Sequence, residues 1–310
     1  MSFPEEASRE GYDYFPVKIH QKLSNNKYEI IRKLGCGPRS STWLAWRASD
    51  DNYFSIKIYT IAASKRAEEV ELPILQLPLS TTVEDLRLKE ETHKLPVLVV
   101  QRAVHCACEA LHVLHGANIM HGAVNAENVY FATGTTTPKL NPEDRPSVKK
   151  IGKFYVIASQ PLKHPFRWRD KRDIVSEWPL QLVNLGHAQK STFKPEPGND
   201  YLSAPETLSQ KPSVSPQTDM WQLGCMILKL LTGSNPPFIS GDDASSRLAS
   251  IQAALGDGSA KSIQALLVDV LDKRDAAKAA GFIRDCLHLN PSRRLTADKA
   301  LQHGWFAANM

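Results

Sequence analysis

Residues 121–128 read His-Gly-Ala-Val-Asn-Ala-Glu-Asn. Apolar residues 119–120 come before this stretch and residues 129–131 follow it, which is typical of a loop that joins a helix to a strand. Ala123 has no lone pair and cannot accept a proton, whereas a histidine and an asparagine can both donate and accept hydrogen bonds. Taken alone, the stretch also fits an ordinary loop in which Gly122 ends the preceding helix. Its meaning therefore depends on the rest of the chain.

The composition is that of a globular protein with one large domain or two lobes. The chain has 310 residues, of which 42% are hydrophobic and 23% are charged. No run approaches the roughly 18 apolar residues of a membrane span, and the start MSFPEEASRE lacks the order of a signal peptide. We therefore expect no membrane segment and a cytoplasmic or nuclear location. The net charge of +5, without a long basic run, gives no specific sign of nucleic-acid binding.

The cysteines are five in number and scattered, which predicts reduced thiols rather than a disulfide framework. His105, Cys106 and Cys108 suggest a zinc site, but no second ligand pair follows at zinc spacing. The segment around them has a helical pattern, so buried helix residues are the favoured interpretation.

The first third of the chain predicts three strands. Residues 27–34 alternate as a strand does, residues 35–46 turn into a second strand, and residues 53–59 form a third. The turn contains Gly35 and Gly37, and a Gly-x-Gly turn lets backbone amides approach a phosphate because neither glycine has a side chain. No helix follows the turn directly, which argues against a dinucleotide-binding fold.

Two helices are expected next, over residues 64–77 and 83–88. The second has the Ser/Thr-x-x-Asp/Glu start of a capped helix. Residues 77–82 are too few for two strands of about five residues each and a connection. We therefore expect a bare link between the two helices.

The rest of the chain predicts a mainly helical region. A helix with apolar residues at helical spacing covers residues 95–114, and Gly116 is its expected C-terminal cap. Residues 132–181 form a long connection that is rich in Pro and Lys. Three short motifs then follow in order: Asn184-Leu-Gly, Ala204-Pro-Glu206 and, near the end, Asn290-Pro-Ser-Arg-Arg294.

In this order, the segments resemble the protein kinase superfamily. Its catalytic loop has His-Arg-Asp, a Lys two residues later and an Asn three residues after that. This chain keeps His121 and Asn128 at the family's separation, but Gly122, Ala123 and Asn125 stand where the family has Arg, Asp and Lys. In the family the Asp accepts the substrate's proton, the Lys steadies the transferring phosphoryl group and the Asn holds magnesium.

The resemblance assigns further expected roles. Asn184 replaces the Asp that is the family's principal magnesium ligand. Lys57 resembles the strand lysine that holds nucleotide phosphates, and Glu71, fourteen residues later (71 − 57), falls where its ion-pair partner would lie. An ordinary surface Lys and a solvated Glu are the alternative. With only residues 77–82 available, the hinge that grips the adenine is expected to be missing.

Three motifs that are structural in the family are kept, at residues 201–206, 219–228 and 289–297. Asp219 is expected to hydrogen-bond the backbone of the catalytic loop, and Arg294 is expected to pair with Glu206. Detailed similarity is to the SR-protein kinases, particularly their fungal branch, on residues 14–19, 33–37, 40–44 and 185–186, and the long segment before Asn184 also fits that branch.

The implied fold is α+β and bilobal, with a reduced N-terminal β lobe and a mainly helical C-terminal lobe. We expect an N-terminal arm at residues 1–26, a reduced N-lobe with three strands and one helix at 27–82, and the C-lobe at 83–310. No catalytic residue is assigned, because Ala123 occupies the base position. No metal ligand is assigned, because Asn128 and Asn184 occupy the magnesium positions. The residues that could still contact a nucleotide are Leu34, Gly35, Cys36, Gly37, Lys57, Glu71 and Asn128.

The leading functional hypothesis is a pseudokinase, a kinase fold kept for binding, scaffolding or regulation, with a protein partner. ATP binding is expected to be weak, and magnesium is not expected. One alternative is an active Ser/Thr kinase of the SR-protein-kinase type, and another is a kinase fold that uses displaced catalytic groups. A gene model that lacks the hinge region remains a third interpretation.

Overall fold

The computed structural model describes residues 15, 17–37, 40–61, 64, 79–132, 148–151, 154–157, 166–167, 170–190, 203–238, 241, 243–256 and 259–306. The chain forms two compact units. The first contains residues 1–81 and 131–165, and the second contains residues 82–130 and 166–310. Residues 131–165 therefore group with the first unit, whereas the sequence interpretation assigned them to the C-terminal lobe.

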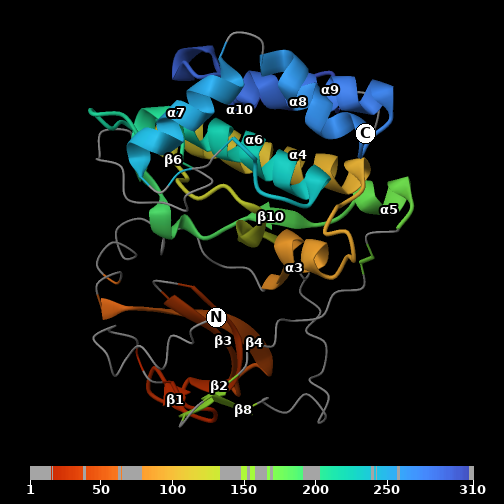
Figure 1. Ribbon diagram of the computed structural model, residues 1–310. Helices are drawn as coiled ribbons and strands as arrows, with labels where there is room; N and C mark the ends of the chain where they lie inside the picture. The colour runs from red at the N-terminus through yellow and green to blue at the C-terminus, as the bar shows by residue number, and fades with distance from the viewer. Residues whose placement is uncertain are drawn as a thin grey trace. The chain divides into compact units, whose positions relative to one another are not determined.

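The first unit contains an antiparallel sheet in the strand order β1-β2-β3-β4. Its strands are β1 (Lys22–Leu23), β2 (Tyr28–Gly37), β3 (Ser40–Arg47) and β4 (Asn52–Tyr59) (Figure 1). The last three correspond to the predicted strands. The described sheet thus has four strands rather than three, because a two-residue strand comes from the segment predicted as an arm.

The extra strand β1 depends on the turn that follows it. Ser24, Asn25 and Asn26 have φ angles of 53°, 54° and 63°, in the left-handed region that Asn tolerates better than most residues. This turn reverses the chain and pairs Leu23 with Tyr28. The polar turn residues were present in the sequence, but two-residue strands have too little pattern to be recognised.

A small apolar core covers one face of this sheet. Val17, Ile30, Trp43 and Ala45 are buried there, with exposed fractions of 6% or less. Successive side chains of a strand point to opposite faces, so the alternating apolar residues of β2 and β3 lie together on the buried face. A second antiparallel pair in this unit consists of β8 (Val148–Ile151) and β9 (Phe154–Ile157), within the predicted long connection.

Residues 79–82 were predicted as part of a bare link, and this prediction is wrong. They form strand β5 (Leu79–Thr82). This strand pairs with β7 (Val129–Ala132), which in turn pairs with β10 (Leu180–Leu182), in the order β10-β7-β5. The length argument excluded two strands and a connection, but a single four-residue strand fits, and its partner lies about 50 residues away in the sequence.

The predicted capped helix is confirmed as α3 (Val83–Leu88). The Thr82 hydroxyl accepts a hydrogen bond from the Asp85 backbone amide at 2.9 Å, and the Asp85 carboxylate accepts one from the Thr82 amide at 2.9 Å. This reciprocal capping box satisfies amides that the first helical turn leaves unpaired. It also fixes the point where β5 ends and the helix begins.

The second unit is mainly helical. Its longer helices are α4 (Val97–Gly116), α6 (Pro216–Thr232), α7 (Ala244–Leu255), α8 (Ser259–Val268) and α9 (Lys273–Cys286), and its shorter ones are α5 (Arg172–Ser176) and α10 (Ala297–Leu301). Helix α4 packs against α6 and α10, and α6 packs against α9 (Figure 1). Short 3-10 turns occur at Ala126–Asn128, Leu185–His187, Pro205–Thr207 and Pro291–Arg293, and a two-stranded sheet joins β6 (Ile119–Met120) to β11 (Gln189–Lys190).

Helix α4 corrects one boundary and has a notable composition. Its last helical residue is Gly116 and its C-cap is Ala117, so Gly116 is not the cap that the sequence suggested. It is long and apolar enough to cross a membrane, and half of that window is buried inside the protein. Val100, Ala107 and Leu111 are fully buried, so the apolar composition serves the packing of this unit.

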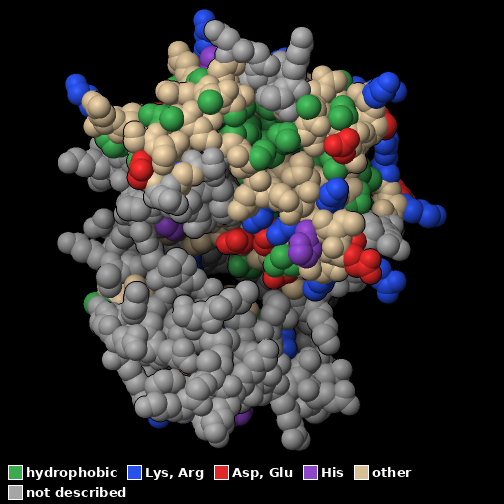
Figure 2. All heavy atoms as spheres, in the orientation of Figure 1, with side chains coloured by type: hydrophobic (Ala, Val, Ile, Leu, Met, Phe, Trp, Pro, Cys, Tyr) green, Lys and Arg blue, Asp and Glu red, His purple; other side chains and the backbone are tan. Residues whose placement is uncertain are grey.

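Charges of both signs are interspersed on the described part of the surface in Figure 2. Acidic, basic and histidine side chains lie close together over α3 and the turn after it, and apolar side chains lie between charged ones elsewhere on this face. The described side chains on this face therefore form no patch of a single charge.

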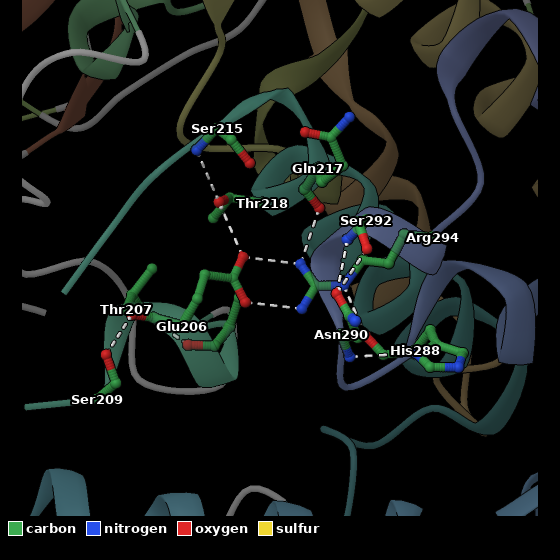
Figure 3. A network of polar contacts seen from close by, with 11 residues as sticks. Glu206, Thr207, Ser209, Ser215, Gln217, Thr218, His288, Asn290, Ser292 and Arg294 are labelled. Atoms are coloured by element: carbon green, nitrogen blue, oxygen red, sulfur yellow. Dashed lines mark hydrogen bonds and ion pairs between the residues drawn. The ribbon is translucent and has the colours of Figure 1, made fainter. Parts of the chain in front are cut away.

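The expected pair between Arg294 and Glu206 is confirmed. Both guanidinium nitrogens Nη1 and Nη2 donate to the carboxylate oxygens of Glu206, at 2.7 Å each (Figure 3). Thr218 donates to the same carboxylate at 3.0 Å, and Arg294 also donates to the carbonyls of Gln217 and His288. The guanidinium lies over the Trp221 ring, 5.1 Å from its centroid. Such a two-pronged, buried pair fixes three distant segments of the second unit together.

A second buried ionic cluster links α3 to α6. Glu84 accepts two hydrogen bonds from Arg87, at 2.7 and 2.8 Å, and Lys229 lies 3.0 Å from the same carboxylate. Arg87 also donates to the carbonyl of Gly233, the residue that ends α6 with a φ of 80°. Burial alone would raise the pKa of Glu84, but the hydrogen bonds from Arg87 and Lys229 outweigh it and leave the pKa lowered.

We predict that Arg294→Ala lowers the free energy of unfolding by about 3–5 kcal/mol, because it leaves the Glu206 carboxylate buried without its cation. Chemical denaturation measures this loss. The matched control is Arg293→Ala, since Arg293 is the exposed neighbour in the same turn. Equal stability of the two variants would contradict the proposed importance of the pair.

We predict a pH dependence of stability from Glu84. Its pKa is lower in the folded protein than in the unfolded chain, so its contribution is complete above its ordinary pKa of about 4.5 and is lost as the pH falls through the lowered value. Glu84→Gln should therefore melt at a lower temperature than the wild type at pH 7, and the difference should shrink below pH 4. Glu91→Gln, at an exposed site after α3, serves as the control that should change little at either pH.

Candidate functional site

The loop at residues 121–128 is held by one buried carboxylate. Asp219 on α6 accepts hydrogen bonds from the backbone amide of His121 at 2.7 Å and from that of Gly122 at 2.8 Å. Its side chain is fully buried and also lies 2.9 Å from Nε2 of His115 on α4. The expected role of Asp219 as the residue that binds the loop backbone is thereby confirmed.

The sequence interpretation missed a second anchor from the same helix. Gln222 accepts a hydrogen bond from the Val124 amide at 2.9 Å and donates one to the Gly122 carbonyl at 3.3 Å. Gln222 lies three residues after Asp219, so both side chains project from the same face of α6. This spacing was a signal in the sequence, because two polar residues interrupt the apolar pattern of a buried helix.

His121 links the loop to the segment before Asn184. The Val183 carbonyl can only accept, so Nε2 of His121 must donate to it at 3.0 Å. Nδ1 accepts from the Ala123 amide at 3.2 Å. These two partners define one neutral tautomer, and the fully buried ring acts as a spacer between two backbone segments.

Gly122 has a backbone conformation that suits glycine. Its φ is 77°, and a Cβ placed there would lie 2.6 Å from the carbonyl oxygen of His187. A side chain at this position would be strained by its conformation and would also collide with backbone. A glycine at this point therefore avoids a collision that any side chain would meet.

Asn128 and Asn184 stand where the resemblance would place the magnesium ligands, and both side chains are amides. Nδ2 of Asn184 donates to Oδ1 of Asn128 at 2.9 Å, and Nδ2 of Asn128 donates to the carbonyl of Ala123 at 2.7 Å. Asn184 has a φ of 71°, a left-handed conformation that Asn adopts more readily than most residues. Asn184 thus turns an N–H toward Asn128, not an oxygen.

This donor set does not fit a magnesium ion. Magnesium requires oxygen ligands and is usually bound through one or two carboxylates, whereas both positions carry neutral amides that are hydrogen-bonded to each other. Among the residues that the structure describes, no three His, Cys, Asp or Glu side chains are grouped as a metal site requires. We therefore assign no chemical step to a metal in this chain.

Ala123 and Asn125, at the positions where the family has its base and its Lys, carry no group that could accept a proton or hold a positive charge. Ala123 is buried and offers only its methyl group, with an exposed fraction of 8%. Asn125, which stands where the family has Lys, is 5% exposed, and its buried Oδ1 has no hydrogen-bond partner in the described part of the protein. Neither side chain can carry a proton or a positive charge at neutral pH.

The residues that could contact a nucleotide are only partly described. Gly35, Cys36 and Gly37 form the last part of β2 and pair with Thr42, Ser41 and Ser40, and the turn after them lies outside the described residues. Leu34 is buried beside Leu44. Lys57 lies on β4, with its ammonium 5.0 Å from the centroid of the Tyr59 ring. Glu71 and most of the predicted helix 64–77 lie outside the described residues, so their pairing stays a prediction.

Among the residues that the structure describes, no metal-binding cluster forms around His105. Cys106 and Cys108 are buried in α4, and burial raises the pKa of Cys106 to about 11 and that of Cys108 further. Both thiols are therefore protonated at neutral pH, whereas zinc binds thiolates. The favoured interpretation, buried helix residues, is confirmed for Cys106 and Cys108, whereas His105 is only partly buried.

Comparison with known proteins identifies the fold of this chain. Residues 177–306 match the family model of the protein kinase domain. A solved kinase-domain structure is similar with a TM-score of 0.62 at 16% identity, covering 94% of this chain and 98% of that one. The chain has the protein kinase fold. The bilobal α+β kinase architecture predicted from the sequence is thereby confirmed.

Curated proteins similar in sequence to this chain include serine/threonine-protein kinases, at low sequence identity. A probable cyclin-dependent serine/threonine-protein kinase of Dictyostelium discoideum is 23% identical over 329 residues, 93% of this chain and 45% of that protein. The kinase cds1 of Schizosaccharomyces pombe is 24% identical over 92% of this chain and 59% of its own length. Calcium-dependent protein kinase 21 of rice is 32% identical over 41% of this chain. This chain spans 59% or less of the length of these three relatives.

We predict that Gly122→Ala lowers the free energy of unfolding by about 1–3 kcal/mol, because a left-handed φ is unfavourable for Ala and its Cβ meets the His187 carbonyl. Gly116→Ala is the matched control, since a Cβ at that helical position meets nothing within 4 Å. Denaturant unfolding of both variants gives the comparison. A Gly122→Ala protein as stable as the control would show that the loop does not need this conformation.

Proposed function

We propose that this chain is a pseudokinase, a kinase fold that binds a partner and does not transfer phosphate at a useful rate. The observation that carries the proposal is the chemistry of the loop. Ala123 stands at the base position, and Asn184 and Asn128 are hydrogen-bonded to each other at the magnesium positions.

The rate arithmetic supports this proposal. A lost general base costs on the order of 10² to 10⁴ in rate. A lost metal ion removes several kcal/mol of charge stabilisation from the transition state. Together the two losses raise the barrier by more than about 6 kcal/mol, or more than about 10⁴ in rate.

The sequence also suggested a third loss, the adenine hinge, and this argument no longer contributes. Strand β5 provides an extended backbone segment just before α3. The proposal therefore rests on the base and metal positions alone. Weak binding of a nucleotide without metal is compatible with this pseudokinase proposal.

The second candidate is an active Ser/Thr kinase. It is favoured by Lys57, which lies on β4 opposite Thr42 of β3, and by relatives that are named serine/threonine kinases. A kinase fold with displaced catalytic groups belongs to the same class. The described residues around Ala123 contribute amides and a buried neutral imidazole, so this candidate ranks second.

A protein partner is part of the proposal. The resemblance to fungal SR-protein kinases makes Ser/Arg-rich segments the first candidates to test, and it suggests the cytoplasm or the nucleus as the location. Such a partner would be bound without being phosphorylated.

We predict that purified wild type transfers no labelled phosphate from ATP to Ser/Arg-rich peptides, with or without magnesium. Ala123→Asp combined with Asn184→Asp should still give little transfer, because Asn125 continues to stand where the family's Lys steadies the transferring phosphoryl group, and misplacement of reactants by about 1 Å already costs about 10² in rate. Lys57→Ala is the control that removes phosphate contacts. Incorporation by the wild type that disappears in Lys57→Ala would overturn the pseudokinase proposal and promote the second candidate.

A further inference from the structure

Two segments of the second unit meet at Asn128 and Asn184. The Val183 amide donates to the carbonyl of Asn128 at 2.9 Å, and His121 donates to the carbonyl of Val183. Beside these backbone contacts runs a chain of side-chain hydrogen bonds from Asn184 to Asn128 and from Asn128 to the Ala123 carbonyl. These side-chain hydrogen bonds thus join the segment around residue 184 to both ends of the loop at 123–128.

The direction of these hydrogen bonds is determined by their last acceptor, the Ala123 carbonyl. The Ala123 carbonyl can only accept, so Asn128 must turn its Nδ2 toward it and its Oδ1 toward Asn184. Asn184 must then present an N–H. An amide at position 184 satisfies this requirement, whereas a carboxylate at that position would place two acceptors face to face.

We propose that this amide chain replaces a divalent cation as the link between the loop at 121–128 and the segment at 183–188, so that the site is assembled without metal and any occupant binds in a metal-independent way. A cation would join two oxygen ligands, and here an N–H of Asn184 takes the place of the positive charge. The inference deepens the proposed function and rests on it in assigning Asn128 and Asn184 to the magnesium positions.

The consequence of Asn184→Asp follows from the same geometry. The new carboxylate would face Oδ1 of Asn128. If the Asn128 amide turned over, its oxygen would face the Ala123 carbonyl instead. Either arrangement leaves two acceptors in contact, and a divalent cation between the carboxylate and Asn128 would relieve the conflict. This substitution should therefore make the stability of the protein depend on a cation.

The experiment measures melting temperature for wild type, Asn184→Asp and Asn184→Gly in EDTA and in millimolar Mg²⁺ or Mn²⁺. The wild type should melt at the same temperature in all of them. Both variants should melt about 2–6 °C lower in EDTA, since each loses hydrogen bonds of partly buried groups. Added Mn²⁺ should restore Asn184→Asp but not Asn184→Gly, which keeps the left-handed backbone and has no carboxylate.

Asn26→Asp provides the matched control, because it makes the same change at an exposed residue with a φ of 63°. It should show neither the loss nor the rescue. Hydrogen exchange of residues 121–130 and 182–188 gives a local measurement, and exchange should quicken there in both Asn184 variants. If Asn184→Asp fails to fold in EDTA, Asn184→Gly alone still tests whether the amide links the two segments.

Three results would overturn the inference. One is stabilisation of the wild type by magnesium or manganese that Asn184→Gly abolishes. The second is a pair of Asn184 variants that melt and exchange as the wild type does. The third is equal rescue of both variants by Mn²⁺. None of these readouts involves phosphate transfer, so failure of this inference is distinguishable from failure of the pseudokinase proposal.

Discussion

The buried carboxylate of Asp219 is the constraint on which the arrangement of the loop depends. It collects two consecutive backbone amides of the loop and the ring of His115 in one fully buried group. An unpaired carboxylate in such a place would be very costly, so the loop amides and the carboxylate each need the other. These contacts hold the loop in a defined shape, and Gly122 takes its left-handed conformation within that shape.

The chain separates the parts of the kinase fold that carry structure from those that carry chemistry. Asp219 and the pair between Glu206 and Arg294 make the contacts expected of them. The range that matches the family model begins at residue 177, after the loop that contains Ala123. Removing such core contacts costs folding stability, whereas removing a catalytic side chain need not disturb the fold.

Much of the fold could be predicted, because its elements have local signals. The capping box at Thr82 and the apolar pattern of α4 were readable in the sequence. Strand β5 was missed because four residues carry no period of their own and its partner β7 is remote. Lengths can exclude structures that need more residues, but they cannot reveal which distant segment a short strand will pair with.

The sequence predicted part of the site's contacts. The hydrogen bonds that Asp219 accepts from the loop backbone were expected from the resemblance, whereas the catalytic losses inferred from Ala123 and Asn184 stay a prediction. The roles of Gln222 and His115 could not be derived in the same way, because they depend on how α4 and α6 pack around the loop. The hydrogen bond between Asn184 and Asn128 likewise follows from three-dimensional direction and not from spacing.

The amide chain has one more consequence, which concerns solution conditions. Carboxamides do not titrate between acid and alkaline pH, and as neutral groups they are little affected by ionic strength. The contact between Asn184 and Asn128 should thus keep the same strength in environments that differ in acidity or salt. In this respect the loop differs from the ionic cluster at Glu84, whose attraction to Arg87 and Lys229 weakens when Glu84 is protonated. Of these two linkages in the second unit, only the one at Glu84 therefore depends on pH.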